Sequence, residues 1–563
     1  MWLYLAVLLG LYYFLRWYRE RQVVSHLRDK FVFITGCDSG FGNQLARQLD
    51  LKGLRVLAAC LTEQGAEQLR NQTSDRLQTV ILDVTKTESV AAATEWVKER
   101  VGDRGLWGLV NNAGICTPMA PNQWLTKQDF VKILEVNLLG VIDVTLSLLP
   151  LVRKARGRVV NVSSVMGRMA VFGGGYSMSK YGVEAFSDSL RRELSYFGVK
   201  VAVIEPGYFL TDLTQEEVYH ENLQTSWDHA SPEIQELYGD NFLADSMWLY
   251  LVVLVVLYYL LRWYRERQVV SHLEDKFVFI TGCDSGFGNR LARQLDQRGL
   301  RVLAACLTEQ GAEQLRNQTS DRLQTVILDI TKTENVTATT NWVKERVGDR
   351  GLWGLVNNAG ICTPTAPNEW LTKQDFVKVL DVNLLGVIDV TLSLLSLVRK
   401  ARGRVVNVSS VLGRVSLSPA GYCISKYGVE AFSDSLRREL SYFGVKVAMI
   451  EPGYFVTNMT QDEGFIGYLQ ALWNRASPEL KELYGENFPA DFLKTLSLLK
   501  PRWTQNLSLV TDCMEHALTA CHPRTRYSAG WDAKFIYLPM SYLPSFLVDL
   551  IVYCYYPQPA KAL

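Results

Sequence analysis

Two tyrosine–lysine pairs have a spacing that could support acid–base chemistry. Tyr422 stands four residues before Lys426, and Tyr176 stands four residues before Lys180. On a helix, residues i and i+4 lie on one face, so the phenol and the ammonium would be neighbours. A free tyrosine keeps its proton up to a pKa of about 10, and a nearby cation favours the phenolate. Such a pair is suited to accept a proton from an alcohol or to donate one to a carbonyl.

A serine accompanies each pair. The spacing of tyrosine and lysine is weak by itself, because most such pairs lie on solvated helix faces. Ser164 and Ser410, however, each stand twelve residues before the tyrosine, at the end of the same local sequence Asn-Val-Ser-Ser. The repeated combination favours a catalytic interpretation.

A glycine-rich stretch follows the first apolar run of each half of the chain. A strand, a glycine turn and a helix together can bind a pyrophosphate, since glycine lets the backbone approach and the helix N-terminus supplies amides. The spacing here is Gly-x-x-x-Gly-x-Gly, and an ordinary tight turn is the alternative. The glycines are Gly36, Gly40 and Gly42, and again Gly282, Gly286 and Gly288.

Amide side chains form a third recurring signal. Asn111-Asn112-Ala113-Gly114 follows a predicted strand, and the carboxyl ends of strands are where open α/β sheets bind ligands. Asn137 and its copy Asn383 lie inside apolar helical runs. A buried amide needs a partner, so each is either a satisfied core residue or a site residue.

The elements around these residues alternate short apolar runs with longer helical ones, which predicts an α/β fold. A helix is expected from about Asn43, directly after the first glycine loop. Six strands are expected in the first half, over residues 31–34, 55–60, 79–82, 107–110, 158–162 and 199–204, and again 246 residues later.

An internal repeat organises the whole chain. Met1-Trp2-Leu3-Tyr4-Leu5 returns at Met247, and the register holds at an offset of 246 without a gap through at least Gly207 and Gly453. This period is too long for a solenoid, so it indicates a duplicated domain, and the restart at a methionine indicates two fused coding units. We predict copy one at 28–246, truncated at its C-terminal end, and copy two at 274–563, with a C-terminal substrate lobe and an apolar tail.

An apolar segment precedes each copy, at residues 1–22 and 247–268. Each is shorter than the roughly 20 apolar residues of a straight span, although the aromatic and arginine residues that follow could extend it. We expect an uncleaved membrane anchor, with the arginines placing the domains in the cytosol. The second segment either lies in the interface or packs against protein, because two full crossings would separate the domains. Residues 535–556 are expected to form an interfacial or substrate-mouth element.

Composition excludes several classes of protein. The chain of 563 residues is 48% hydrophobic with a net charge of +1, which fits a globular protein of roughly two to four domains and not a nucleic-acid-binding one. The ten cysteines show no CxxC pair, which favours reduced thiols. The six histidines form no ligand cluster, so no metal is expected.

Taken together, these motifs resemble the short-chain dehydrogenase/reductase family, and over nearly all of both copies. The resemblance is strongest to its membrane-bound retinol dehydrogenase and oxidative 3α/17β-hydroxysteroid dehydrogenase branch. The stretches that carry it include Phe-Ile-Thr-Gly-Cys-Asp-Ser-Gly-Phe-Gly, Asn-Asn-Ala-Gly and, from His522, His-Pro-Arg-Thr-Arg-Tyr-Ser-Ala-Gly-Trp-Asp-Ala-Lys. It implies two tandem Rossmann-like, doubly wound parallel-sheet domains, each preceded by an apolar anchor helix.

The resemblance also implies residue roles. In copy two Tyr422 is the acid/base, Lys426 binds the nicotinamide ribose and lowers the pKa of Tyr422, Ser410 binds the reacting oxygen and Asn383 holds a water. The counterparts in copy one are Tyr176, Lys180, Ser164 and Asn137. The implied cofactor-binding residues are Gly36, Ser39, Gly40, Phe41, Gly42, Asp83, Asn111, Ala113, Gly114, Pro206 and Gly207 in copy one, and Gly282, Ser285, Gly286, Phe287, Gly288, Asp329, Asn357, Ala359, Gly360, Pro452 and Gly453 in copy two.

Charge near the second strand bears on the choice of cofactor. NADP requires a cation near its 2′-phosphate, and the stretch Ala58-Ala59-Cys60-Leu61-Thr62 contains no Lys or Arg. Asp38 and Asp284, in the glycine loops, would repel a phosphate. NAD is therefore predicted, although Cys60 and Cys306 stand where the family usually has the acid that binds the ribose.

The substrate follows from the resemblance and from the apolar segments. We expect a lipophilic alcohol, all-trans-retinol or a 3α-hydroxysteroid, at the endoplasmic reticulum membrane, with oxidation mainly in copy two. The two copies pair within the chain or through homo-oligomers. The alternatives are a hydroxysteroid dehydrogenase with little retinoid activity and a non-catalytic, cofactor-binding membrane protein.

Overall fold

The structure is a computed structural model. It describes residues 26–118, 120–170, 174–207, 268–364, 366–417, 420–461, 463–499, 503–553 and 557–562. The predicted anchor at 1–22, and the second apolar segment up to residue 267, lie outside the described residues.

Copy one is built on a six-stranded parallel sheet in the order β3-β2-β1-β4-β5-β6. The central strands are apolar runs buried on both faces, as expected when helices cover a parallel sheet on both sides. The strands are β1 (Phe31–Thr35), β2 (Arg55–Cys60), β3 (Leu77–Ile81), β4 (Gly108–Asn111), β5 (Arg158–Val162) and β6 (Lys200–Ile204).

The helices of copy one connect these strands and cover the sheet. The long connection between β4 and β5 contains a π-helical turn, η4 (Glu135–Leu139), between two α-helices. The α-helices are α2 (Gly40–Leu51), α3 (Glu63–Arg70), α4 (Thr87–Val101), α5 (Lys127–Leu134), α6 (Gly140–Lys154) and α7 (Gly174–Ser195), and η5 (Val165–Gly167) is a short 3₁₀ turn.

Copy two repeats this arrangement and adds an edge strand, in the order β13-β12-β11-β10-β7-β8-β9. Its strands are β7 (Phe277–Thr281), β8 (Arg301–Cys306), β9 (Leu323–Ile327), β10 (Gly354–Asn357), β11 (Arg404–Val408), β12 (Lys446–Pro452) and β13 (Arg526–Ala529). The matching helices are α11 (Gly286–Gln297), α12 (Glu309–Arg316), α13 (Thr333–Val347), α14 (Lys373–Leu380), η10 (Asp381–Gly386), α15 (Val387–Lys400), η11 (Val411–Gly413) and α16 (Ala420–Leu440).

A C-terminal lobe follows β12 in copy two. It places α21 on one face of the sheet and ends in three short helical pieces, so the apolar stretch from residue 535 is not one straight helix. The elements are α17 (Asn458–Gln461), α18 (Glu463–Arg475), α19 (Pro478–Tyr484), α20 (Phe488–Leu499), α21 (Ser508–Thr519), η14 (Ala533–Tyr537), α22 (Leu538–Met540) and α23 (Ser545–Tyr553).

The predicted fold class is confirmed, with small shifts in the boundaries. Strand β3 begins at Leu77 rather than at residue 79. Helix α2 begins at Gly40 rather than near Asn43, because the glycines themselves form its first turn and Ser39 is its N-cap residue. Glycine propensity argues against a helix start there, and tertiary contacts decide it.

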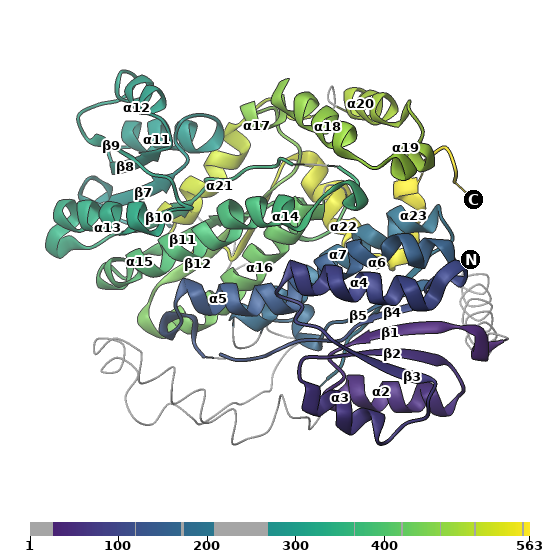
Figure 1. The fold of residues 1–563 in the computed structure, drawn as a ribbon. Helices are drawn as coiled ribbons and strands as arrows, with labels where there is room; N and C mark the ends of the chain where they lie inside the picture. Colours follow the sequence, from purple (N-terminus) through teal and green to yellow (C-terminus); the bar gives the residue numbers. More distant parts are fainter. Residues whose placement is uncertain are drawn as a thin grey trace, which may run out of the picture.

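The two copies pack side by side through α5, α7, α14 and α16 (Figure 1). The contacts occur in pairs related by the sequence offset of 246. The rings of Phe130 and Phe432 meet edge to face at 6.3 Å, and those of Phe186 and Phe376 do the same at 6.3 Å. A single apolar core runs through both copies. The chain is thus folded as an internal dimer with approximate two-fold symmetry.

Within the described ranges, two helical stretches, Lys127–Lys154 and Lys373–Lys400, are long and apolar enough to cross a membrane. They are the α5–α6 and α14–α15 stretches, and their apolar windows are 72% buried in the fold. Their hydrophobicity is explained by core packing within and between the copies.

Candidate active site

The glycine loops require glycine for close approach and for backbone conformation. Gly36 has φ +69°, and a Cβ there would lie 2.7 Å from the Cα of Ala113. A Cβ on Gly42 would lie 2.2 Å from the carbonyl oxygen of Gly36. Copy two repeats both contacts at Gly282 and Gly288. The glycine loop therefore packs closely against the main chain that follows β4. It places the N-terminus of α2 at the carboxyl edge of the sheet.

The start of α2 and α11 fits the phosphates of a dinucleotide. Gly40 has φ +59° and no atom within 4 Å of where its Cβ would be, and the nearest atom to that point on Gly286 is 4.0 Å away. The N-cap residues, Ser39 and Ser285, make no side-chain cap hydrogen bond to the helix. Open space in front of main-chain amides and a helix dipole suits an anion.

Asp38 lies at the end of β2. Its carboxylate accepts hydrogen bonds from the main-chain N–H of Leu61 at 2.8 Å and of Thr62 at 3.0 Å. Asp284 makes the same bonds to Leu307 and Thr308. Sequence reasoning noted no acid directly after β2, yet the tertiary fold brings one there from the glycine loop. Burial, the largest effect, and then Asp38 raise the pKa of the Cys60 thiol to about 12, so the cysteine is neutral.

Asp83 and Asp329 follow the third strand of each sheet, and local hydrogen bonds fix their carboxylates. Asp83 accepts a hydrogen bond from the hydroxyl of Thr85 at 2.7 Å, which is the largest cause of its lowered pKa, and pairs with Lys86 at 3.0 Å. Asp329 repeats this arrangement with Thr331. Both carboxylates are therefore ionised acceptors at the same sheet edge as the glycine loop.

The Asn-Asn-Ala-Gly stretch is tied to the sheet by its asparagines. The amide of Asn111 donates to Thr145 and to Asn161, both at 2.8 Å. This side chain therefore forms buried hydrogen bonds inside the domain. The main-chain N–H groups of Asn112 and Ala113 donate to the hydroxyl of Thr35. Asn357 and its neighbours repeat these bonds. The main chain is thus the part of this stretch best placed to face a cofactor.

Asn137 and Asn383 are buried in the π-helical turns η4 and η10. The Oδ1 of Asn383 accepts from the N–H of Ile361 at 2.8 Å, and its Nδ2 donates to the Ile361 carbonyl at 2.8 Å and to Ser425 at 3.1 Å. A Cβ on Gly360 would lie 3.2 Å from that Oδ1 and 3.8 Å from the Nζ of Lys426. Asn383 therefore holds the main chain of Ile361 at the edge of the sheet, and Gly360 lies between its amide and Lys426.

The lysines are buried on α7 and α16. The Nζ of Lys180 and of Lys426 donates to the carbonyl of Val162 and of Val408, each at 2.9 Å. Each ammonium lies about one helical turn from its tyrosine, 5.6 Å from the ring centroid in copy one and 5.5 Å in copy two. Burial lowers the pKa of both lysines to about 8. The predicted pairing along one helix face is present in both copies.

Burial is the largest electrostatic effect on Tyr422 in copy two. Burial, the largest effect, raises the pKa of its phenol well above the usual value, and the nearby Cys362 adds to this. The hydrogen bond with Ser410 opposes it. Burial therefore favours the protonated phenol, and the lowering of this pKa by Lys426 stays a prediction.

Ser410 is the N-cap residue of η11, and its Oγ accepts from the N–H of Leu412 at 3.1 Å. Ser164 has the same role before η5. These turns end β11 and β5, so each serine reaches the same edge as the tyrosine. Asn161 and Asn407, each followed by Val-Ser in a potential glycosylation sequence, are fully buried.

The motif Pro452-Gly453 ends β12 and leads to an aromatic wall in copy two. Tyr454 stacks on Trp503 with centroids 5.6 Å apart, and lies 5.6 Å from Tyr537. Asp532 accepts from the N–H of Tyr454 at 2.7 Å, and a Cβ on Gly453 would lie 2.2 Å from its Oδ1. Tyr537, Leu417 and Tyr422 pack against the same buried cluster, which includes Val411. The sequence analysis expected a substrate-mouth element at residues 535–556, which contains Tyr537, but it did not single out Tyr454 or Trp503.

In copy one the corresponding region lies outside the described residues. The carbonyl of Pro206 accepts from the N–H of Val165 at 3.0 Å, and Gly207 is the last residue described before 268. The four catalytic candidates of copy one are nevertheless arranged as in copy two, on η4, β5–η5 and α7.

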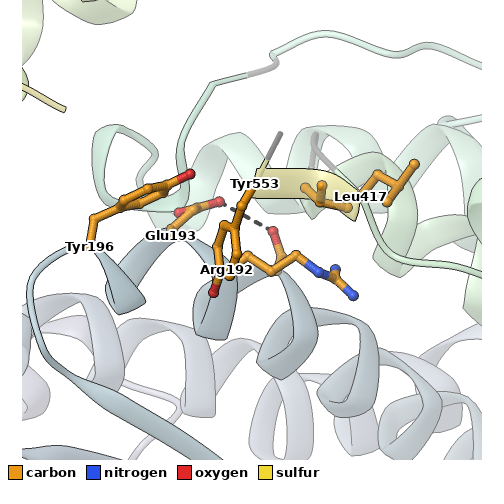
Figure 2. A pocket seen from close by; sticks show the side chains of 7 residues that line it. Arg192, Glu193, Tyr196, Leu417 and Tyr553 are labelled. Carbon is orange, nitrogen blue, oxygen red and sulfur yellow. Dashed lines mark hydrogen bonds between the residues drawn. The ribbon is translucent and has the colours of Figure 1, made fainter. Parts of the chain in front are cut away.

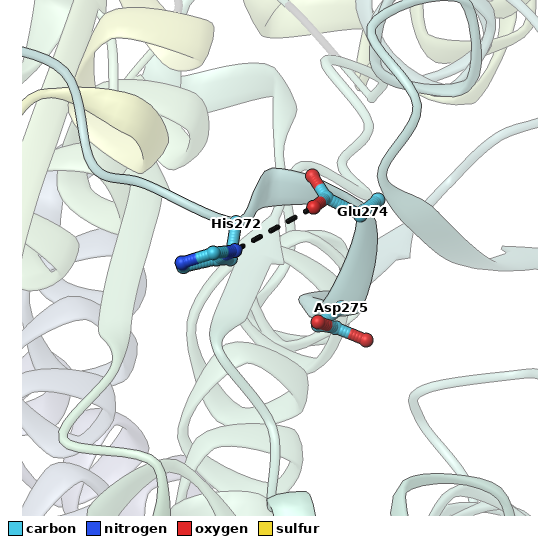
Figure 3. A group of neighbouring side chains, drawn as sticks. All are labelled: His272, Glu274 and Asp275. Atoms are coloured by element: carbon cyan, nitrogen blue, oxygen red, sulfur yellow. Dashed lines mark ion pairs between the residues drawn. The ribbon is translucent and has the colours of Figure 1, made fainter.

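Among the described residues, one group of side chains could reach a common metal ion, namely His272, Glu274 and Asp275 (Figure 3). All three are exposed at the entry to β7, and His272 lies 3.7 Å from Glu274. Arg28 stands in place of Glu274 in copy one. The group is therefore not part of the duplicated site.

Comparison with known proteins agrees with this geometry. The family model "short chain dehydrogenase" matches residues 30–222 and 276–464. The chain therefore belongs to the short-chain dehydrogenase family, once in each copy, and it is an oxidoreductase. This fold binds a nicotinamide dinucleotide, and the glycine cradle described above fits one.

Individual relatives cover half of the chain. Human retinol dehydrogenase 16 is 76% identical over 317 residues, which are 56% of this chain and 100% of that protein. Rat retinol dehydrogenase 7 is 70% identical over 317 residues, and human 17-beta-hydroxysteroid dehydrogenase type 6 is 64% identical over 319 residues, with the same shares covered. The predicted family and the tandem arrangement are thus confirmed.

Proposed function

We propose that the protein oxidises a lipophilic alcohol with NAD, mainly in copy two. The observation that carries this proposal is the placement of Tyr422. Its phenol bonds with Ser410 and lies one turn from Lys426, and its ring packs against the same buried cluster as Tyr537 of the C-terminal lobe. All-trans-retinol and 3α-hydroxysteroids are the proposed substrates, since the relatives are named for retinol and hydroxysteroid oxidation.

The proposed proton path uses four residues of copy two, which we call the tetrad: Asn383, Ser410, Tyr422 and Lys426. The bound cofactor supplies an oxidised nicotinamide that accepts the hydride from the carbinol carbon. Tyr422 takes the hydroxyl proton, and Ser410 hydrogen-bonds the same oxygen. Lys426 holds the ribose side, and Asn383 fixes the loop of Ile361 beside it. General acid–base catalysis of this kind contributes about 10²–10⁴ in rate.

The pH dependence of this path follows from the local electrostatics. Burial holds the proton on Tyr422, so oxidation requires positive charge close to the phenol. The Lys426 ammonium provides it, but only while protonated, and its pKa is lowered to about 8. The rate of oxidation should therefore pass through a maximum as the pH rises, and it should fall when Lys426 loses its proton.

The preference for NAD over NADP is proposed from Asp284 and Asp38. Each carboxylate is anchored to the main chain at the end of the second strand of its sheet. An anion fixed there would repel a 2′-phosphate and could accept a hydrogen bond from a ribose hydroxyl.

We place the protein at the endoplasmic reticulum membrane, facing the cytosol, with residues 1–22 and 247–268 as apolar anchors. The C-terminal lobe supports a membrane-side substrate entrance, because Phe535 is 76% exposed and Tyr542 73% exposed. Phe546 and Leu550 are also exposed on the same lobe. Single exposed apolar residues are common, but several on one lobe mark an interaction surface.

Copy one is proposed to bind NAD and to turn over poorly. It carries Tyr176, Lys180 and the glycine cradle, yet no counterpart of β13 or of the lobe stands among its described residues. A reacting centre without a cover would stay wet and would hold its substrate loosely.

The test is NADH formation by membranes that carry the full chain, with all-trans-retinol and with a 3α-hydroxysteroid. Tyr422→Phe serves as the control and should abolish turnover. Turnover of the steroid alone would favour a hydroxysteroid dehydrogenase with little retinoid activity. If neither alcohol reacts while NAD binds, the non-catalytic alternative is correct.

A further inference from the structure

The last helix of copy two docks on copy one. Asp549, on α23, is buried and accepts from the Nε of Arg192 at 2.9 Å, and it also pairs with Arg191. Both arginines lie on α7 of copy one. The ring of Tyr553 meets that of Tyr196 at 5.5 Å and 71°. In Figure 1, α23 accordingly lies against the copy-one domain.

Arg192 makes a second contact with copy two. Its Nη1 donates to the carbonyl of Ser416, in the loop between η11 and α16. The Ser416 hydroxyl in turn donates to the carbonyl of Ala185, also on α7, at 2.9 Å. Ser416 is fully buried. One guanidinium of copy one therefore joins two separate parts of copy two.

Both of these parts line the substrate side of the copy-two site. Val415 packs with Met540 and Val548 of the lobe. Leu417 packs against the same buried cluster as Tyr422 and Tyr537. Figure 2 shows Arg192 on α7 and Tyr196 directly after the end of that helix, beside Leu417 and Tyr553 from copy two. Arg192 thus contacts both the Ser416 loop and α23 of the lobe, the two parts that pack near Tyr422.

The matching position in copy two lacks this arrangement. Arg438 donates to the carbonyl of Ala170, as Arg192 does to Ser416, and to the carbonyl of Asp434 at 3.1 Å. It is exposed, whereas Arg192 is only 6% exposed. Among the described residues of copy one, no carboxylate pairs with Arg438. Met169, the counterpart of Val415, is 58% exposed against 4%.

We propose that Arg192 is a positioning residue for the reaction in copy two. By holding the Ser416 loop and α23 together, it closes the substrate lobe over Tyr422. Copy one thereby acts as a structural subunit of the copy-two active site, whether or not it turns over substrate. This inference rests on the proposed function in one respect only, the identity of the alcohol that the closed lobe holds.

The first test does not depend on activity. Hydrogen exchange is followed at the α23 amides in the full chain, in Arg192→Ala, and in Arg438→Ala as the matched control. Local opening raises exchange, so protection of residues 545–553 should fall at least about tenfold in Arg192→Ala and less than about twofold in Arg438→Ala. Equal protection in the two variants, or unchanged protection in Arg192→Ala, would overturn the proposal.

The second test separates positioning from general destabilisation. In Arg192→Ala the KM for the alcohol should rise about tenfold while the KM for NAD stays unchanged, because the cofactor loop is untouched. Asp549→Ala should raise the same KM, and the effect of the double variant should be smaller than the sum of the two single effects, because the two side chains share one ion pair. Additive effects, or an equal rise in both KM values, would contradict it.

The two tests also distinguish this inference from the proposed function. If the unmodified chain forms no NADH with any alcohol, the proposed function fails, while the exchange experiment still decides whether Arg192 holds the lobe. If NADH forms and protection is insensitive to Arg192, the function stands and this inference fails.

Discussion

The helix after the glycine loop is packed differently in the two copies. In copy two, Leu291 and Leu295 on α11 are fully buried under α21, against Val510 and Met514. Their counterparts in copy one, Leu45 and Leu49, are only partly buried. The local sequences are nearly the same, so the difference comes from the C-terminal lobe after β12, and not from the helix.

The open edge of the sheet shows the same contrast. Strand β12 is buried along almost its whole length because β13 pairs with it. Strand β6 has alternating exposed residues, including Ile204 at 51%. The tetrad geometry, by contrast, is the same in both copies to within about 0.1 Å for the lysine–tyrosine distance. A dehydrogenase site can thus be assembled locally while its substrate side depends on a distant segment.

The largest difference between the copies should appear in catalysis. Tyr422→Phe removes the proton acceptor of the covered site and should lower turnover by at least about a hundredfold. Tyr176→Phe should change it by less than about twofold. Steady-state NADH formation by the full chain measures both, with NAD binding as the control for folding. Loss of turnover in Tyr176→Phe alone would reverse the assignment.

The next difference concerns a buried ion network. Arg526, on β13, pairs with Glu430 at 2.9 Å, Asp434 at 3.0 Å and Glu451 at 3.2 Å. Arg526→Ala would leave buried carboxylates without their partner and should cost about 3–5 kcal/mol in unfolding free energy. In copy one Arg168 is 53% exposed beside Glu184, and Arg168→Ala should cost about 1 kcal/mol. Urea unfolding compares the two, and equal losses would count against the comparison.

A smaller difference is expected from the helix after the glycine loop. Leu291→Ala leaves a cavity beneath α21 and should destabilise copy two by about 2–4 kcal/mol. Leu45→Ala removes a side chain that water already reaches, and should cost about 1 kcal/mol. Thermal unfolding of the paired variants checks this. A large loss of stability in Leu45→Ala would mean that another part of the chain buries α2 in copy one, as α21 buries α11 in copy two.

The smallest difference between the copies is expected for two buried carboxyls, which should titrate alike. Burial, the largest cause, raises the pKa of Glu193 and of Glu439 to about 8, although Asn368 and Asn122 donate to these carboxyls from the other copy. A raised carboxyl pKa means that its stabilising contribution is complete below about pH 4.5, declines as the pH rises and is lost above about pH 8.

The measurement is the urea midpoint between about pH 6 and pH 8, which should fall for the unmodified chain. Glu193→Gln with Glu439→Gln removes both titrations and should flatten the slope. A slope that persists in the double variant would assign it to other groups.

The sequence by itself determined the class of fold, the duplication and the tetrad. Those features depend on local spacing, because a strand, a glycine turn and a Tyr-x-x-x-Lys helix each act over a few residues. Its strand positions were correct to within about two residues, since apolar runs between polar turns mark them. The anchors and the exact domain boundaries remain predictions.

Only the tertiary structure decided three other points. It brought Asp38 to the end of β2, where sequence order gave Cys60. It raised the pKa of Tyr422 by burial, which spacing cannot report. It also placed Arg192 of copy one against Asp549 of copy two, 357 residues apart. Each is a contact between segments distant in sequence, and such contacts are fixed by packing of the whole fold rather than by any local pattern.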